Sequence, residues 1–141
     1  MKFLILSILS ALLLSASDIS QQVRILEKIV SEISLGEEIK IWSDDKNIIR
    51  QLNKYSKFKT TKDCKDATCI ILKDKKNLPK VCENTHIFVL DYKLLSKIPQ
   101  SFGALFWKKG RPNIVILEPR IKAQRVIISK NLMPYLEERV W

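Results

Sequence analysis

Two apolar stretches in the last third of the chain flank a short polar segment. They cover residues 102–107 and 114–117, and residues 108–112 between them read Lys-Lys-Gly-Arg-Pro. This spacing predicts a β-hairpin in which Gly110 supplies the positive φ angle of the turn. Alternate residues should face opposite sides of the first strand, with Phe102, Ala104 and Phe106 on one side and Gly103, Leu105 and Trp107 on the other. Both sides are apolar, so helices are expected above and below the sheet.

The rest of the chain alternates between helical and strand patterns. Apolar residues recur at helical spacing over 19–33, after a capping box formed by Asp18 and Gln21, and Gly36 ends the segment. Before the hairpin we expect a strand at 39–42, a helix capped by Ser43 or Asp44, a minor strand at 58–61, a strand at 69–72, a short helix or turn at 77–82, a strand at 86–90 and a helix at 92–98. After the hairpin we expect a helix near 120–125, an apolar segment at 126–128 and a last helix capped by Ser129. This order predicts a single α/β domain with a mostly parallel sheet, flanked by helices and carrying a late antiparallel hairpin. The architecture resembles one lobe of a periplasmic binding protein.

The first 17 residues have the pattern of a secretory signal peptide. Lys2 precedes an apolar run at 3–14, and small residues stand at Ser15 and Ser17. The run is shorter than the roughly 20 residues that a membrane span needs. We therefore expect cleavage before Asp18, a mature domain at 18–141 and a periplasmic location; an uncleaved membrane anchor is the alternative.

Positive charge narrows the class of partner. The chain has 25 Lys and Arg against 15 Asp and Glu, which gives a formal net charge of +10. Such a balance favours acidic partners, anionic headgroups or nucleic acid. An exported chain would not meet nucleic acid, so we expect an envelope or membrane protein as partner, or peripheral contact with anionic membrane or wall. A homodimer is left open.

Motifs for catalysis, metals and cofactors are missing from the sequence. Gly36, Gly103 and Gly110 are too scattered for a phosphate-binding loop. His86 is the only histidine and has no nucleophile motif beside it, so a structural role is favoured. The cysteines lack CxxC spacing. We therefore expect no enzyme, no metal site and no cofactor.

Three cysteines in an exported chain predict a disulfide. A strand that starts at Cys69, followed by a returning connection, would bring Cys64 and Cys82 to the same edge of the sheet. We favour this pair, with Cys69 as a buried thiol. A Cys69–Cys82 pair and three reduced cysteines are the alternatives.

Two groups of surface residues are candidate binding sites. The first is the hairpin tip, expected to bind a partner through Trp107, Lys108, Lys109 and Arg111. Its alternative is a solvated turn whose lysines only keep it in water. The second is a ligand cleft at the carboxyl ends of the strands, formed by Trp42, Asp91 and Tyr92. For Trp42, packing in the core is the favoured alternative.

Residues 102–136 contain, in order, a glycine-containing strand with Gly103, a turn glycine at Gly110, an apolar strand at 114–117, a helix, and an I-S-x-x-L segment with Ile128, Ser129 and Leu132. This order resembles the C-terminal part of the YfiR-like family of periplasmic regulators. The CKDATCIILKD segment is similar to the family's cysteine-containing strand, with Cys64 or Cys69 as its cysteine. The chain departs from the family at Glu118 and Pro119, where an Asn is usual, and in its opening helix, where the family has an aromatic-rich segment ending in Trp-Pro.

The resemblance implies a non-enzymatic periplasmic binding or regulatory protein that modulates a membrane-bound sensor or diguanylate cyclase. A single-lobe periplasmic protein that binds a small molecule is the alternative function.

Overall fold

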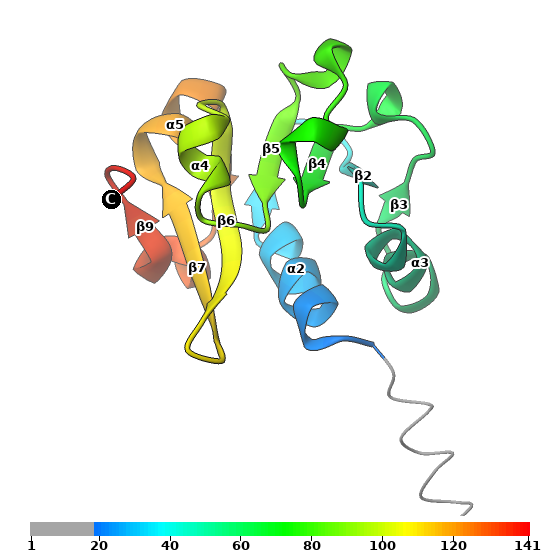
Figure 1. Ribbon diagram of the computed structural model, residues 1–141, viewed down its shortest axis with the longest axis horizontal. Helices are drawn as coiled ribbons and strands as arrows, with labels where there is room; N and C mark the ends of the chain where they lie inside the picture. Colours follow the sequence, from blue (N-terminus) through cyan, green and yellow to red (C-terminus); the bar gives the residue numbers. More distant parts are fainter. Residues whose placement is uncertain (1–18) are drawn as a thin grey trace, which may run out of the picture.

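The computed structural model describes residues 19–141, so the predicted signal peptide and the predicted cap at Asp18 lie outside the described residues (Figure 1). The fold is α/β, as the sequence predicts. Its main sheet has seven strands in the order β3-β2-β4-β5-β6-β7-β9. Neighbours run parallel except in the β6–β7 hairpin. The strands are β2 (Lys40–Ser43), β3 (Lys59–Thr60), β4 (Cys69–Leu72), β5 (His86–Val89), β6 (Ser101–Lys108), β7 (Arg111–Leu117) and β9 (Leu136–Glu137).

Helices and turns cover both faces of this sheet, as the two-sided apolar strands predict. They are α2 (Gln21–Ser31), α3 (Lys46–Tyr55), η1 (Cys64–Asp66), η2 (Lys75–Asn77), η3 (Lys80–Cys82), α4 (Leu94–Lys97), α5 (Glu118–Gln124) and η4 (Lys130–Tyr135). On one face α2, α3, α5 and η4 pack against Ile41, Ile71 and Phe88 of the sheet. On the other face η1, η3 and α4 pack against Ile70, Leu72 and Ile87.

The first helix is amphipathic, but its ends differ from the prediction. Ser20 is the N-cap, because its hydroxyl accepts a hydrogen bond from the backbone N–H of Val23 at 3.2 Å. The helix ends at Ser31, and Ile33 lies in the short strand β1 (Ile33–Ser34). This strand pairs antiparallel with β8 (Ile127–Ile128) in a separate two-stranded sheet. Ile33 therefore leaves the helix because a partner nearly a hundred residues later offers its backbone hydrogen bonds.

Two other helix starts test the predicted caps. Ser129 caps the last helical segment, as predicted, and this segment is a 3-10 helix. The cap of α3 is Asp45 and not Ser43 or Asp44, because the Asp45 carboxylate accepts from the N–H of Asn47 at 2.9 Å. The Asp44 carboxylate instead accepts from the backbone N–H groups of Lys73 and Asp74, and so ties the end of β4 to the end of β2.

The hairpin turn consists of Lys109 and Gly110. Both residues have positive φ angles, 52° and 75°, as a two-residue turn of type I′ requires. The predicted alternation of side chains holds from Gly103 onward, but Phe102 is an exception. A register shift between β5 and β6 at this point turns Phe102 to the same face as Leu105, where its ring lies 5.6 Å from that of Phe88.

A disulfide joins Cys64 in η1 to Cys82 in η3, which confirms the favoured pairing. Cys69 opens β4 at the centre of the sheet and is free and buried. Burial raises the pKa of its thiol to about 12.

Candidate partner-binding surface

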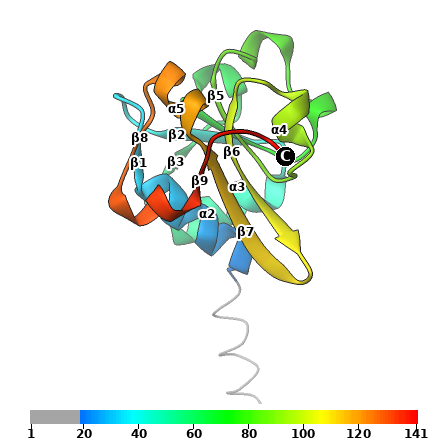
Figure 2. The same cartoon turned by 90° about the vertical axis from the view of Figure 1, so that its left-hand side faces the viewer.

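The β6–β7 hairpin extends past the ends of its neighbouring strands and carries the predicted binding residues at its tip (Figures 1 and 2). Trp107 ends the apolar part of β6 and is 40% exposed. Lys108, Lys109 and Arg111 surround the turn and are exposed. Among the described residues, none of these three cations forms an ion pair within 4 Å. The tip therefore presents an indole ring beside three charges without partners.

A hollow of about 560 Å³ lies beside the tip; we call it the aromatic hollow. It is lined by Tyr92, Phe106, Trp107, Lys108, Asn113 and Trp141. The rings of Tyr92 and Phe106 stack in a tilted arrangement with centroids 5.1 Å apart. Four aromatic side chains and one cation thus meet at one surface position.

Sequence reasoning missed three members of this hollow, Phe106, Asn113 and Trp141, of which Trp141 is the most distant along the chain. Its backbone N–H donates to the hydroxyl of Tyr92 at 2.7 Å, although 49 residues separate the two. The guanidinium of Arg139 lies 4.3 Å from the centroid of the Trp141 ring, within range of a cation–π interaction. Trp141 remains 78% exposed. No local pattern in the sequence signals a contact across this separation.

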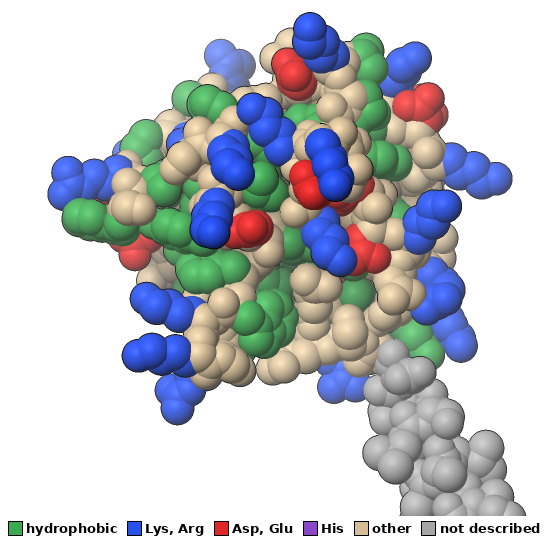
Figure 3. All heavy atoms as spheres, viewed as in Figure 1, with side chains coloured by type: hydrophobic (Ala, Val, Ile, Leu, Met, Phe, Trp, Pro, Cys, Tyr) green, Lys and Arg blue, Asp and Glu red, His purple; other side chains and the backbone are tan. Residues whose placement is uncertain are grey.

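Positive charge extends well beyond the hairpin (Figure 3). Lys and Arg side chains spread over the face shown, with a group at the lower left, over the hairpin tip, below several hydrophobic side chains. The tip is therefore distinguished less by charge alone than by the combination of cations with exposed aromatic rings.

The predicted ligand cleft at the strand ends is not one cavity. Trp42 is half-buried and lines a hollow of about 640 Å³ between the end of β2, α3 and β3, with Asn53 and Thr60 among its other walls. Tyr92 lines the aromatic hollow instead. The Asp91 carboxylate accepts from the N–H of Lys93 at the start of α4. Trp42 and Tyr92 thus line two different hollows.

Two polar side chains hold the scaffold behind the hairpin. The guanidinium of Arg120, from α5, donates to the carbonyl oxygens of Leu95 at 2.8 Å and Ser101 at 2.9 Å. Burial lowers the pKa of Arg120 from its usual value. His86 contacts the side-chain oxygen of Gln124 through Nδ1 at 3.3 Å, a structural position at the start of β5.

The described residues offer no obvious place for a metal. Within residues 19–141 no three His, Cys, Asp or Glu side chains are grouped closely enough to bind an ion. Over the same residues, no helix combines the length and the hydropathy that crossing a membrane requires.

Comparison with models of known protein families finds no match for this chain. A search of curated proteins also finds no match.

Proposed function

We propose that this chain is a non-enzymatic binding and regulatory protein of the cell envelope that docks on a membrane sensor protein. The observation that carries the proposal is the exposed Trp107 beside three unpaired cations and the aromatic hollow. Trp, Tyr and Arg are the residue types that dominate binding energy at protein interfaces. A two-stranded scaffold anchored in the main sheet keeps them in place without a large loss of entropy on binding.

Two further observations support the envelope and the kind of partner. The Cys64–Cys82 disulfide is typical of chains that fold in an oxidising compartment. The three cations at the tip favour an acidic partner surface, and such complementarity speeds the encounter at low salt. The resemblance of residues 102–136 to the YfiR-like family extends the proposal to a partner that is a membrane-bound sensor or diguanylate cyclase.

The proposal is tested by capture of envelope proteins on the immobilised chain. Lys108→Glu, Lys109→Glu and Arg111→Glu together should weaken capture of a specific partner at least tenfold, because like charges would then face an acidic surface. The matched control is Lys57→Glu, Lys65→Glu and Lys75→Glu, which changes three exposed lysines elsewhere by the same charge.

Both variants should keep the thermal unfolding midpoint of the parent chain, because all six side chains are exposed. Equal loss of capture in both variants would mean that net charge and not the tip binds the partner. If the hairpin-tip variant captures the partner as well as the parent chain does, the tip is only a solvated turn and does not bind the partner.

A further inference from the structure

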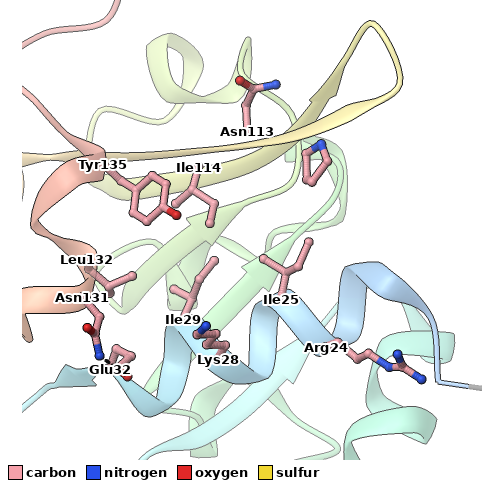
Figure 4. A pocket seen from close by; sticks show the side chains of 11 residues that line it. Arg24, Ile25, Lys28, Ile29, Glu32, Asn113, Ile114, Asn131, Leu132 and Tyr135 are labelled. Carbon is pink, nitrogen blue, oxygen red and sulfur yellow. Dashed lines mark hydrogen bonds between the residues drawn. The ribbon is translucent and has the colours of Figure 1, made fainter.

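A groove of about 680 Å³ runs along the outer edge of β7 and shares only Asn113 with the lining of the aromatic hollow (Figure 4). We call it the β7 groove; α2, β7 and η4 form its walls, with residues Arg24, Ile25, Lys28, Ile29, Glu32, Pro112, Asn113, Ile114, Asn131, Leu132 and Tyr135. Figure 4 shows Ile25 and Ile29 pointing from α2 toward Ile114 on β7. Ile25 and Ile114 are only half-buried. The groove therefore has an apolar floor that the chain itself leaves partly open.

The backbone of β7 is unpaired along this groove. Strand β9 pairs only with Ile116 and Leu117, and within residues 19–141 no strand pairs with the outer edge of β7 before Ile116. The two-residue turn makes Lys108 and Arg111 a hydrogen-bonded pair, and such pairs alternate along an antiparallel ladder. Ile114 lies three positions beyond Arg111, so its N–H and C=O point away from β6 toward the groove.

Pro112 has the same orientation as Ile114. It occupies a non-hydrogen-bonded position opposite Trp107, where its missing N–H leaves no gap in the β6–β7 ladder. Only its carbonyl oxygen faces outward. The open edge from Arg111 to Val115 is about 13 Å long, and it offers two acceptors and one donor, at Pro112 and Ile114.

The charges at the mouth of the groove are unequal. Arg24 and Lys28 are exposed on α2, one turn apart. The Glu32 carboxylate is already occupied at the η4 end, where it accepts from the Ser129 hydroxyl and from the Asn131 amide at 3.1 Å. These hydrogen bonds lower the pKa of Glu32. The open part of the groove therefore favours an anionic occupant.

We propose that the β7 groove binds an extended, acidic and apolar segment of a partner protein, which adds as a strand to the open edge of β7. Backbone hydrogen bonds to Pro112 and Ile114 would give affinity. On the side of the segment that turns toward α2, apolar side chains would pack on Ile25 and Ile114, and carboxylates would reach Arg24 and Lys28 at the mouth of the groove. The volume and the edge length fit about four or five extended residues.

A second copy of this chain fits the edge less well. Two β7 edges would bring their arginines and lysines together in a chain of net charge +10. Pro112 also removes one of the few donors that such a pair would share.

The test uses a fluorescent, end-capped peptide of five residues, Val-Val-Glu-Glu-Val, which places valine and glutamate on both faces of the extended strand. A second peptide has lysine in place of each glutamate. The glutamate peptide should bind at least tenfold more tightly than the lysine peptide. Arg24→Glu with Lys28→Glu should remove this preference. Lys46→Glu with Arg50→Glu is the matched control, because these exposed cations have the same spacing on α3, and it should change binding less than about threefold.

Strand addition has its own readout at the backbone. Bound peptide should slow hydrogen exchange of the Ile114 amide. N-methylation of alternate peptide residues should abolish binding for one of the two possible sets and spare the other, because only one set faces β7.

Equal binding of both methylated peptides, or an unprotected Ile114 amide in the complex, would overturn the proposal. No binding of the glutamate peptide at millimolar concentration would also overturn it. Dimerisation that protects Ile114 without peptide would assign the edge to a second copy. None of these results depends on the hairpin tip, so the test stands apart from that of the docking surface.

Discussion

Arg120 shows how one side chain can hold three segments together. Its guanidinium reaches from α5 to the carbonyl groups of Leu95 in α4 and of Ser101 at the start of β6. Both carbonyl groups belong to buried residues, where an acceptor without a donor is unfavourable. Both hydrogen bonds leave from the same nitrogen, Nη1, so a lysine would have to bring its single ammonium group to that position.

We therefore expect Arg120→Ala to lower the free energy of unfolding by roughly 2 to 3 kcal/mol, because it leaves carbonyl groups without a partner. Arg120→Lys should restore only part of this loss. Urea unfolding followed by circular dichroism measures it, and Lys130→Ala, an exposed change, should stay within about 0.5 kcal/mol of the parent. An Arg120→Ala variant as stable as the parent would show that water replaces the guanidinium.

Some elements follow from local sequence and others depend on distant partners. Residues 69–72 form β4 as predicted, since a run of four apolar residues between turn signals specifies a strand covered on both faces. The direction of Phe102 could not be predicted, because the register shift that turns it belongs to the pairing with β5. Ile33 fits the helical spacing as well as the apolar residues within α2 do. Only its pairing with Ile128 places it in strand β1 and not in the helix.

The residues of the candidate surfaces also divide into those that local sequence predicts and those that depend on contacts with distant segments. Trp107 and the tip cations come from one continuous stretch and were predicted together. Trp141 joins Tyr92 through a contact between distant segments, which no spacing rule reveals. For the β7 groove the sequence does contain a signal. Ile25 lies beside the buried residues of α2 and widens the apolar stripe more than one buried face needs.

The disulfide acts on the element scale, because it links η1 before β4 to η3 after it. It closes a loop with a sequence separation of 18 residues. Cys64→Ala with Cys82→Ala should lower the free energy of unfolding by about 3 kcal/mol, mainly because the unfolded chain regains freedom.

Reductant provides the control for this prediction. Dithiothreitol should destabilise the parent chain by a similar amount and leave the double variant unchanged, as measured by urea unfolding. A parent chain that is insensitive to reductant after confirmed reduction would mean that packing alone holds η1 and η3.

At the scale of the whole molecule, stability comes from the apolar layers and not from ion pairs. The four salt bridges within residues 19–141 each include at least one side chain that is two-thirds exposed or more, and such pairs contribute little. The charged surface therefore contributes little to the stability of the fold. Because the apolar layers hold the fold together, a residue at the centre of the sheet becomes exposed when the whole molecule unfolds.

Cys69 lies at that centre and links the stability of the fold to pH. Burial raises its thiol pKa to about 12 in the folded chain, above the usual value of 9.0. Above pH 9 the unfolded chain loses this proton while the folded chain keeps it, so the free energy of unfolding falls as the pH rises. The loss should approach about 1.4 kcal/mol per pH unit between pH 9 and 12.

Cys69→Ala isolates this effect from the titration of lysines and tyrosines. The variant should be less stable at pH 7, because the missing sulfur leaves a gap in the core. Between pH 9 and 10.5, however, its free energy of unfolding should fall less steeply than that of the parent, so that the two stabilities converge. Urea unfolding of the parent and the variant at pH 9 and at pH 10.5 measures this difference. Parallel decline in both chains would show that the Cys69 thiol ionises without unfolding, and that the centre of the sheet opens locally to solvent.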